Sequence, residues 1–345
     1  MIKLLKGEKM KKLILYILGF VLLCFLLPII YTQRAQTKET GTFINDYNEI
    51  STNTIAEENI KLTYKEKKTV KLLHVKTGEI EELPMEEYLY GVVSAEMPAN
   101  YQEEALKAQA IVARTYTIYK MYNGSKHENA DICDDSTCCQ AWISKEDRLS
   151  KWNEELREEN WQKITTAVNE TNGKIITYNG EPINAFFHSN SGGTTETVNN
   201  VWGGSDYPYL QSVETSGEEE YIQYSSSLTL TKDEVLAKLQ EKYPETVIDW
   251  NMQNPINIIE YTESGRIKTI KFGNTSISGV EARTIFGLKS AKFNIEIGEN
   301  ITFNVVGYGH GVGLSQTGAD AMAKIGANAE QIINHYYTGV KIENI

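Results

Sequence analysis

One carboxylate stands where a helix is expected to end. Glu96 follows an apolar stripe at residues 88–93 and directly precedes Met97 and Pro98. Proline disfavours helical backbone at the residue before it, so the helix should stop here. The electronegative end of a helix and an apolar flank both raise the pKa of a carboxyl group. Glu96 is therefore a candidate proton donor, although an exposed acid without function would explain the same spacing.

Two cations follow on the next expected helix, at residues 101–122. Lys107 and Arg114 are seven positions apart, and this spacing places both on one face of a helix. If that face meets Glu96, the three side chains form a cleft for an anionic or polar substrate. Solvated surface charges remain the alternative interpretation.

A third group of residues has the chemistry of a metal site. Four soft or borderline donors lie within thirteen residues: His127, Cys133, Cys138 and Cys139. They suffice for tetrahedral Zn²⁺, although their spacing matches no standard zinc finger, and free thiols in a surface loop are the alternative. Asp134 and Asp135 could replace a cysteine that points away. Four protein ligands leave no open position, so such a zinc would fasten the loop rather than activate water.

The remaining candidates lie in polar or glycine-rich loops. His188 and Ser191, in "HSNSGG", could hydrogen-bond sugar hydroxyls, and a solvated turn explains them equally well. Trp202 could stack on a sugar ring, but a core position is the preferred interpretation. The run "GYGHGVG" lacks the pattern of a phosphate-binding loop, and we expect its His310 to be a buried, hydrogen-bonded residue.

The elements that must position these residues indicate an α+β domain. Strands are expected in hairpins, at 69–83, 174–189 and 258–273, with helices between them, so the sheets should be antiparallel. Capping boxes are expected at Asn100 with Glu103 and at Thr231 with Glu234. Two lobes, 60–215 and 216–345, could enclose a substrate groove.

The N-terminal sixty residues differ from this domain. Residues 1–12 carry five lysines and one glutamate, and residues 13–30 carry no charge and would span about 27 Å as a helix. We expect a transmembrane anchor at 13–30 rather than a cleaved signal peptide, with 1–12 in the cytoplasm, 31–59 as a flexible stalk, and 60–345 outside the cell. The net charge of −12 argues against a nucleic-acid partner.

The motif "YLYGVVSAEMPANYQEEALKAQAIVARTYT", with "HSNSGGTTE", "YLQSV" and "GYGHGVGLSQTGA", resembles the stage II sporulation protein D family over residues 60–340. The resemblance implies a membrane-anchored lytic transglycosylase that cuts peptidoglycan glycan strands during engulfment of the forespore. It implies that Glu96 is the catalytic acid and that the loop cysteines and histidine hold zinc.

The resemblance also implies a substrate groove and partners. Its expected lining is Lys107, Arg114, His188, Ser191, Tyr209 and Gln211, where Gln211 stands in "YLQ" at a position that is basic ("YLK") in the family. An amidase/endopeptidase and a polytopic membrane protein are the partners that the family implies. Two other functions stay open: a glycan-binding scaffold that does not cut, and a zinc amidase or peptidase.

Overall fold

The computed structural model describes residues 68–345. The expected cytoplasmic segment, anchor and stalk lie outside these residues. Within residues 68–345, no helix combines the length and the apolar character needed to cross a bilayer.

The first described elements build toward the helix that carries Glu96. Strands β1 (Thr69–Leu73) and β2 (Ile80–Pro84) form an antiparallel hairpin, and α3 (Met85–Glu96) follows directly. A short strand, β3 (Ile132–Cys133), adds to β1 in parallel. The hairpin and the helix were both expected from the sequence.

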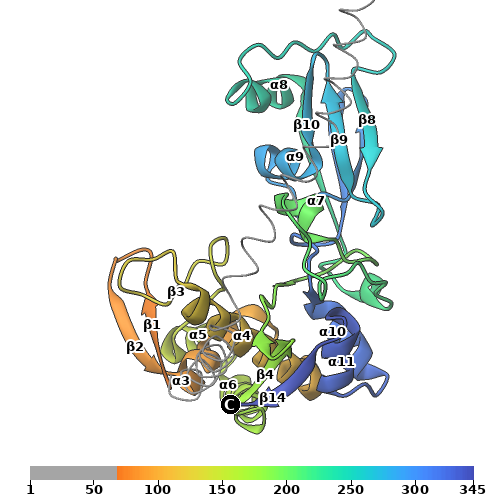
Figure 1. Ribbon diagram of the computed structural model, residues 1–345. Helices are drawn as coiled ribbons and strands as arrows, with labels where there is room; N and C mark the ends of the chain where they lie inside the picture. Colours follow the sequence, from red (N-terminus) through yellow and green to blue (C-terminus); the bar gives the residue numbers. More distant parts are fainter. Residues whose placement is uncertain (1–67) are drawn as a thin grey trace, which may run out of the picture. The chain divides into compact units, whose positions relative to one another are not determined.

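A long helix, α4 (Glu103–Asn123), forms the centre of the surrounding core, with most of its residues buried. It packs against α3, α6 (Arg157–Glu170), α10 (Gln316–Lys324) and α11 (Ala329–Tyr336) (Figure 1). Alanines at the contact positions, such as Ala105 and Ala113, allow this close approach on several sides. Two short helices, α5 (Lys145–Lys151) and η1 (Glu154–Leu156), precede α6.

One expected cap is wrong. Asn100 was predicted to cap the second helix with Glu103, but α4 begins after Gln102, and no side chain caps it. The N–H of Gln102 instead donates to the buried carboxylate of Asp320, so a residue distant in sequence takes over this position.

The hairpin around residues 174–182 has the turn that its sequence predicts. Strands β4 (Lys174–Tyr178) and β5 (Glu181–Pro182) are joined by Asn179 and Gly180, both with positive φ, as a two-residue hairpin turn requires. The C-terminal strand β14 (Lys341–Asn344) pairs with the other edge of β4. Strand β14 therefore completes a sheet whose other two strands lie about 160 residues earlier in the sequence.

A parallel pair of short strands joins the loop after residue 188 to the segment that precedes α10. Strand β6 (Phe187–His188) lies beside β13 (Leu314–Ser315), and α10 follows β13 without a break. The loop after β6 contains α7 (Val198–Trp202) and leads to η2 (Glu218–Glu220).

Residues 225–306 have a core of their own, formed by two antiparallel sheets and two helices. One sheet has the order β11-β12-β7 and the other β10-β9-β8. Their apolar faces meet around Phe272, Phe286 and Phe303. The elements are β7 (Ser225–Thr231), α8 (Lys232–Gln240), β8 (Ile256–Tyr261), β9 (Ile267–Phe272), β10 (Thr275–Ser278), α9 (Gly279–Phe286), β11 (Phe293–Ile297) and β12 (Asn300–Val306).

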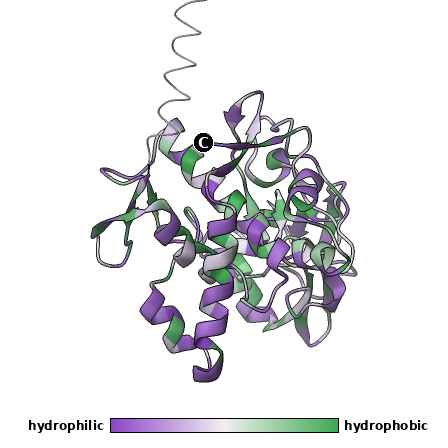
Figure 2. Cartoon of the chain, turned by 90° about the horizontal axis from the view of Figure 1, so that it is seen from below, coloured by the Kyte–Doolittle hydropathy of each residue, from purple (hydrophilic) through white to green (hydrophobic). Residues whose placement is uncertain are grey.

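The α+β class is confirmed, with mostly antiparallel strand pairs. The capping box of Thr231 and Glu234 is present at the start of α8. In Figure 2, hydrophilic residues predominate on the helices and loops at the edge of the view, and hydrophobic residues are frequent toward its middle.

Candidate active site

Glu96 is the last residue of α3, where the sequence predicted the helix to end. Met97 is already extended, with φ −122° and ψ 141°, and its N–H still donates to the carbonyl of Val93. Tyr88, Leu89 and Val92 are buried and lie on the same side of the helix, one to two turns before Glu96. The end of α3 therefore holds Glu96 at a defined place.

The carboxyl group of Glu96 is held by two neutral donors from distant parts of the chain. The backbone N–H of Ala141 donates to Oε1 at 2.6 Å, and the amide Nε2 of Gln316 donates to Oε2 at 3.3 Å. Burial raises the pKa of Glu96, and the two hydrogen bonds offset only part of this rise. Glu96 therefore keeps its proton to higher pH than an exposed glutamate does, as a general acid must.

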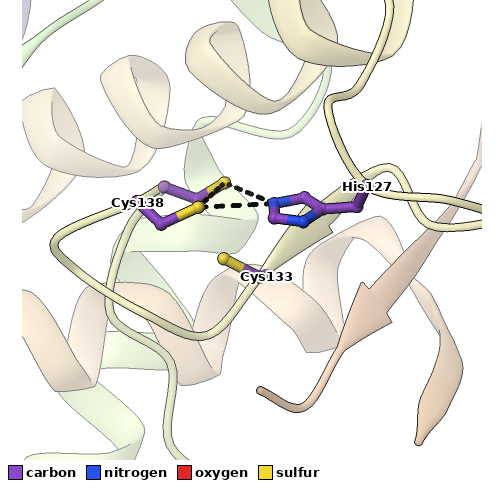
Figure 3. A group of neighbouring side chains, drawn as sticks. His127, Cys133 and Cys138 are labelled. Carbon is purple, nitrogen blue, oxygen red and sulfur yellow. Dashed lines mark hydrogen bonds between the residues drawn. The ribbon is translucent and has the colours of Figure 1, made fainter. Parts of the chain in front are cut away.

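The four expected metal ligands converge on one point. Their ligand atoms all lie within 4.8 Å of one another. Figure 3 shows His127 and Cys138 directed toward each other, with the sulfur of Cys133 pointing into the same space from β3. Distances from the imidazole Nε2 are 3.4 Å to Cys139 Sγ and 3.5 Å to Cys138 Sγ, and the last two sulfurs are 3.8 Å apart.

The three separations among His127, Cys138 and Cys139 fit tetrahedral zinc. With bonds of about 2.3 Å to sulfur and about 2.0 Å to nitrogen, such an ion separates two sulfurs by about 3.8 Å and a sulfur from a nitrogen by about 3.5 Å. The cluster of His127, Cys133, Cys138 and Cys139 could thus hold a metal such as zinc.

Two acids considered as substitute ligands are engaged elsewhere. The carboxylate of Asp134 accepts from the N–H of Val75 and lies against His74. Asp135 accepts from the backbone and hydroxyl of Thr137, which closes the turn that carries the last two cysteines. Neither acid is needed to complete the ligand set.

The metal cluster and Glu96 are neighbours along the chain. Cys139 is followed by Gln140, whose buried amide donates to Tyr88 Oη at 2.7 Å and to Thr117 Oγ1 at 3.0 Å. The next residue is Ala141, which donates to Glu96. The loop that carries the cluster therefore supplies one of the two donors to the carboxyl group.

Arg114 requires a correction. Its side chain is 1% exposed, so it cannot line an open groove. The guanidinium donates to the carbonyls of Thr171, Lys174 and Val168, where α6 ends. Burial lowers its pKa to about 10, so it stays charged at neutral pH and serves as the cap of α6.

Arg114→Met should therefore reduce stability rather than substrate affinity. The substitution keeps an unbranched apolar side chain but leaves buried carbonyls without their donor, and we expect a loss of about 3 kcal/mol, or roughly 6–12 °C in Tm. Thermal unfolding measures it, with Lys151→Met on the exposed end of α5 as the control. An unchanged Tm would contradict the capping role.

Lys107 shares its helix face with Arg114, as the spacing predicted, but that face meets α6 as well. The ammonium pairs with Glu103, Glu104 and Glu170, at 2.7, 3.1 and 2.6 Å. Burial alone would lower its pKa, and the three carboxylates raise it instead. Lys107 is thus already neutralised, and its role in substrate binding stays a prediction.

Three more expected groove residues are buried. The Nδ1–H of His188 donates to the carbonyl of Val312, and burial, with Arg266 nearby, lowers the pKa of His188 to about 3. Ser191 is bound to the carboxylate of Glu218, and the hydroxyl of Tyr209 accepts from the N–H of Asn184. Each of the three is less than 7% exposed, and their predicted roles in lining a substrate groove stay predictions.

Trp202, His310 and Gln211 are less buried than the three residues above. Trp202 is 51% exposed, so the expected core position is wrong. It lies against Phe186 and His310, with ring centroids 4.8 and 5.0 Å away. His310 accepts from the N–H of Val312, which confirms its hydrogen-bonded role. Gln211 is exposed, with its amide on the carbonyl of Pro208.

No role was predicted for Ala141, Gln316 or Glu218. Gln316 stands in the quoted motif "GLSQTGA", so the signal was present but unassigned. Ala141 acts through its backbone, and Glu218 lies in an acidic run whose pattern indicates only surface. These three roles depend on contacts between distant segments.

Comparisons with known proteins agree with the motifs. A family profile described as "Stage II sporulation protein" matches residues 74–178. The chain is 33% identical over 340 residues to stage II sporulation protein D of Bacillus amyloliquefaciens, covering 96% of each chain. The chain belongs to this family. It is 37% identical to the stage II sporulation protein D of Bacillus subtilis, over 76% of this chain and 75% of that one.

Another relative of the chain has a different name. The chain is 28% identical over 306 residues to the amidase enhancer of Bacillus subtilis, covering 74% of this chain and 40% of that protein. The chain is thus a sporulation protein of this family, related to an amidase enhancer.

Proposed function

We propose that the protein is a lytic transglycosylase that cleaves the MurNAc–GlcNAc bond of peptidoglycan and leaves 1,6-anhydro-MurNAc ends. The observation that carries this proposal is the state of Glu96: a carboxyl group at the end of a helix, with its pKa raised by burial and with two neutral hydrogen-bond donors. Family membership and the expected membrane anchor agree with it.

The chemistry requires only one carboxyl group. Glu96 protonates the glycosidic oxygen as its bond to the anomeric carbon of the muramic sugar breaks. The 6-hydroxyl oxygen of the same sugar then attacks the anomeric carbon, and the carboxylate of Glu96 accepts the proton of this hydroxyl. Hydrolases that admit water ordinarily need a second carboxylate, which an internal nucleophile makes unnecessary. Zinc held by the cluster would fasten the loop that ends at Ala141, since its four ligands leave no open position.

The setting of the reaction is part of the proposal. Residues 13–30 anchor the protein in the membrane, with the N-terminus in the cytoplasm and the catalytic domain on the outer side of the septal or engulfing membrane. The substrate is the glycan strand of the wall during sporulation. The partners are an amidase/endopeptidase that removes stem peptides and a polytopic membrane protein.

Product analysis tests the proposal directly. The purified full-length protein is incubated with glycan strands, either denuded or peptide-bearing, and the products are separated and weighed by mass spectrometry. We expect ends 18 Da lighter than hydrolysed ones, because no water is added. Hydrolysed ends, or intact strands at every protein concentration, would reject the activity.

A second candidate function is a scaffold that binds glycan and assists another wall hydrolase. The relationship to a protein named as an amidase enhancer favours it. The two functions differ in one result: a scaffold is retained on wall sacculi and stimulates an added amidase but forms no anhydro ends by itself. A zinc amidase is disfavoured because all four positions of the metal would be filled by protein.

A further inference from the structure

Gln316 is the first residue of α10 and is 4% exposed. Its amide reaches Glu96, which lies 220 positions earlier in the chain. Ordering a buried glutamine side chain costs conformational entropy, and an apolar residue would fill the same space more simply. The buried amide of Gln316 is therefore expected to have a role in its contact with Glu96.

The two residues that flank Gln316 donate hydrogen bonds to one buried carboxylate. Glu218 is fully buried and accepts hydrogen bonds from the hydroxyls of Ser315 and Thr317, the two residues that flank Gln316. It also accepts from the backbone and hydroxyl of Ser191 in the loop after β6. Glu218 thus clamps the start of α10 to this loop, and Gln316 enters the site from a fixed position.

A carboxyl group that transfers a proton has two protonation states, and these require different hydrogen-bond partners. The carboxylate only accepts hydrogen bonds, whereas the acid carries an O–H that needs an acceptor. The N–H of Ala141 can only donate, so it serves one oxygen in both states. A glutamine amide carries a donor and an acceptor on one terminal group that turns about a soft torsion.

We propose that Gln316 is a positioning residue for Glu96, which donates to the carboxylate through Nε2 and, after its amide turns over, accepts from the carboxylic acid through Oε1. This inference rests on the proposed function of Glu96. It assigns to Gln316 the task of keeping one carboxyl group oriented through both proton transfers.

Ionisable groups on the surrounding elements are held by other partners. Asp320, one turn further along α10, binds the N–H of Gln102 and the hydroxyl of Tyr221 and pairs with Lys324. On the loop that carries Ala141, His127 and the three cysteines face one another in the metal cluster, and Asp131, Asp134 and Asp135 accept from the N–H groups of Lys71, Val75 and Thr137. Glu218 is directed at hydroxyl and backbone donors. Burial therefore raises the pKa of Glu96, and the hydrogen bonds from Ala141 and Gln316 are the contacts that oppose this rise.

Gln316→Met tests the proposal, since methionine has a similar length and cannot hydrogen-bond in this way. We expect kcat to fall about 10- to 100-fold with KM little changed, the range for one hydrogen bond to a charged group. The pH at which activity falls on the alkaline side should rise by about one pH unit, because the bond to the carboxylate is the stronger of the two that are lost. Gln162→Met, on the exposed side of α6, is the matched control and should change neither value.

A second measurement does not depend on activity. In full-length protein labelled with ¹³C at glutamate side chains, the signal of Glu96 is assigned by its loss in Glu96→Gln and followed through pH. Its midpoint should rise in Gln316→Met and stay in place in Gln162→Met. An unshifted midpoint, or lost activity with an unshifted pH profile, would overturn the role of Gln316. Absence of anhydro ends from the wild-type protein would instead count against the proposed function alone.

Discussion

Glu96→Gln is expected to reduce the formation of 1,6-anhydro ends by at least about 100-fold while the fold is retained. Glutamine has the same shape but cannot transfer a proton, and general acid–base catalysis contributes about 10²–10⁴-fold. Its amide still accepts from Ala141, and the amide of Gln316 can turn to accept from it. Mass spectrometry of glycan products measures the loss, with Glu343→Gln on the exposed face of β14 as the control.

The same substitution should make the protein more stable at neutral pH. Because the pKa of Glu96 is raised in the folded state above its ordinary value of 4.5, the folded state binds this proton more tightly than the unfolded state. The stability from this proton is fully present below pH 4.5 and is lost as the pH rises through the folded pKa. Glu96→Gln removes the ionisation, so its Tm should increasingly exceed that of the wild type as pH rises.

Thermal unfolding at several pH values from 4 to 8 checks this second effect. An inactive Glu96→Gln variant that melts well below the wild type at all pH values would mean that activity was lost through the fold. Full activity in a stable variant would remove Glu96 from the mechanism altogether.

Local features could be read from the sequence because their causes lie within a few residues. The end of α3 follows from Pro98, the turn of the β4–β5 hairpin from Asn179 and Gly180, and the start of α8 from Thr231 and Glu234. The metal cluster belongs to the same class, because its four donors lie within thirteen residues. Short separations leave few alternative arrangements.

Side-chain environments could not be read in this way. Spacing correctly put Lys107 and Arg114 on one face of α4, but it did not say that α6 packs on that face and buries the arginine. The prediction for Trp202 was wrong in the opposite direction. A large apolar residue is expected to be buried, but half of the Trp202 side chain at the end of α7 is exposed. Helical periodicity specifies a direction, and only the tertiary fold specifies what lies there.

The candidate site depends most strongly on contacts that span the chain. Glu96 could be chosen from its local motif, but its partners Ala141 and Gln316 come from 45 and 220 positions away. Strand β13 brings Gln316 into place by pairing with β6, two strands of two residues each that no periodicity can predict.

Removal of the metal ligands should have the second large effect. We expect about one zinc per chain in the full-length protein, measured by elemental analysis, and its loss in Cys138→Ser and Cys139→Ser. Asp134→Asn and Asp135→Asn are the matched controls and should retain the metal, because both carboxylates are engaged with other groups. Metal retained in both serine variants, or lost in an aspartate variant, would contradict the ligand set.

The stability lost with the metal can be bounded by mass action. At free zinc about 100-fold above its Kd, binding contributes about 2.7 kcal/mol, and its loss should lower Tm by roughly 5–11 °C. Activity should fall as well, because the chain runs from Cys139 through the buried Gln140 to Ala141, the donor to Glu96. If the zinc is structural, a cysteine variant assayed below its own Tm should lose only part of its activity, because the loop that carries Ala141 is then less well ordered. Complete loss of activity in a variant whose Glu96 still titrates as in the wild type would instead implicate the metal in the chemistry itself.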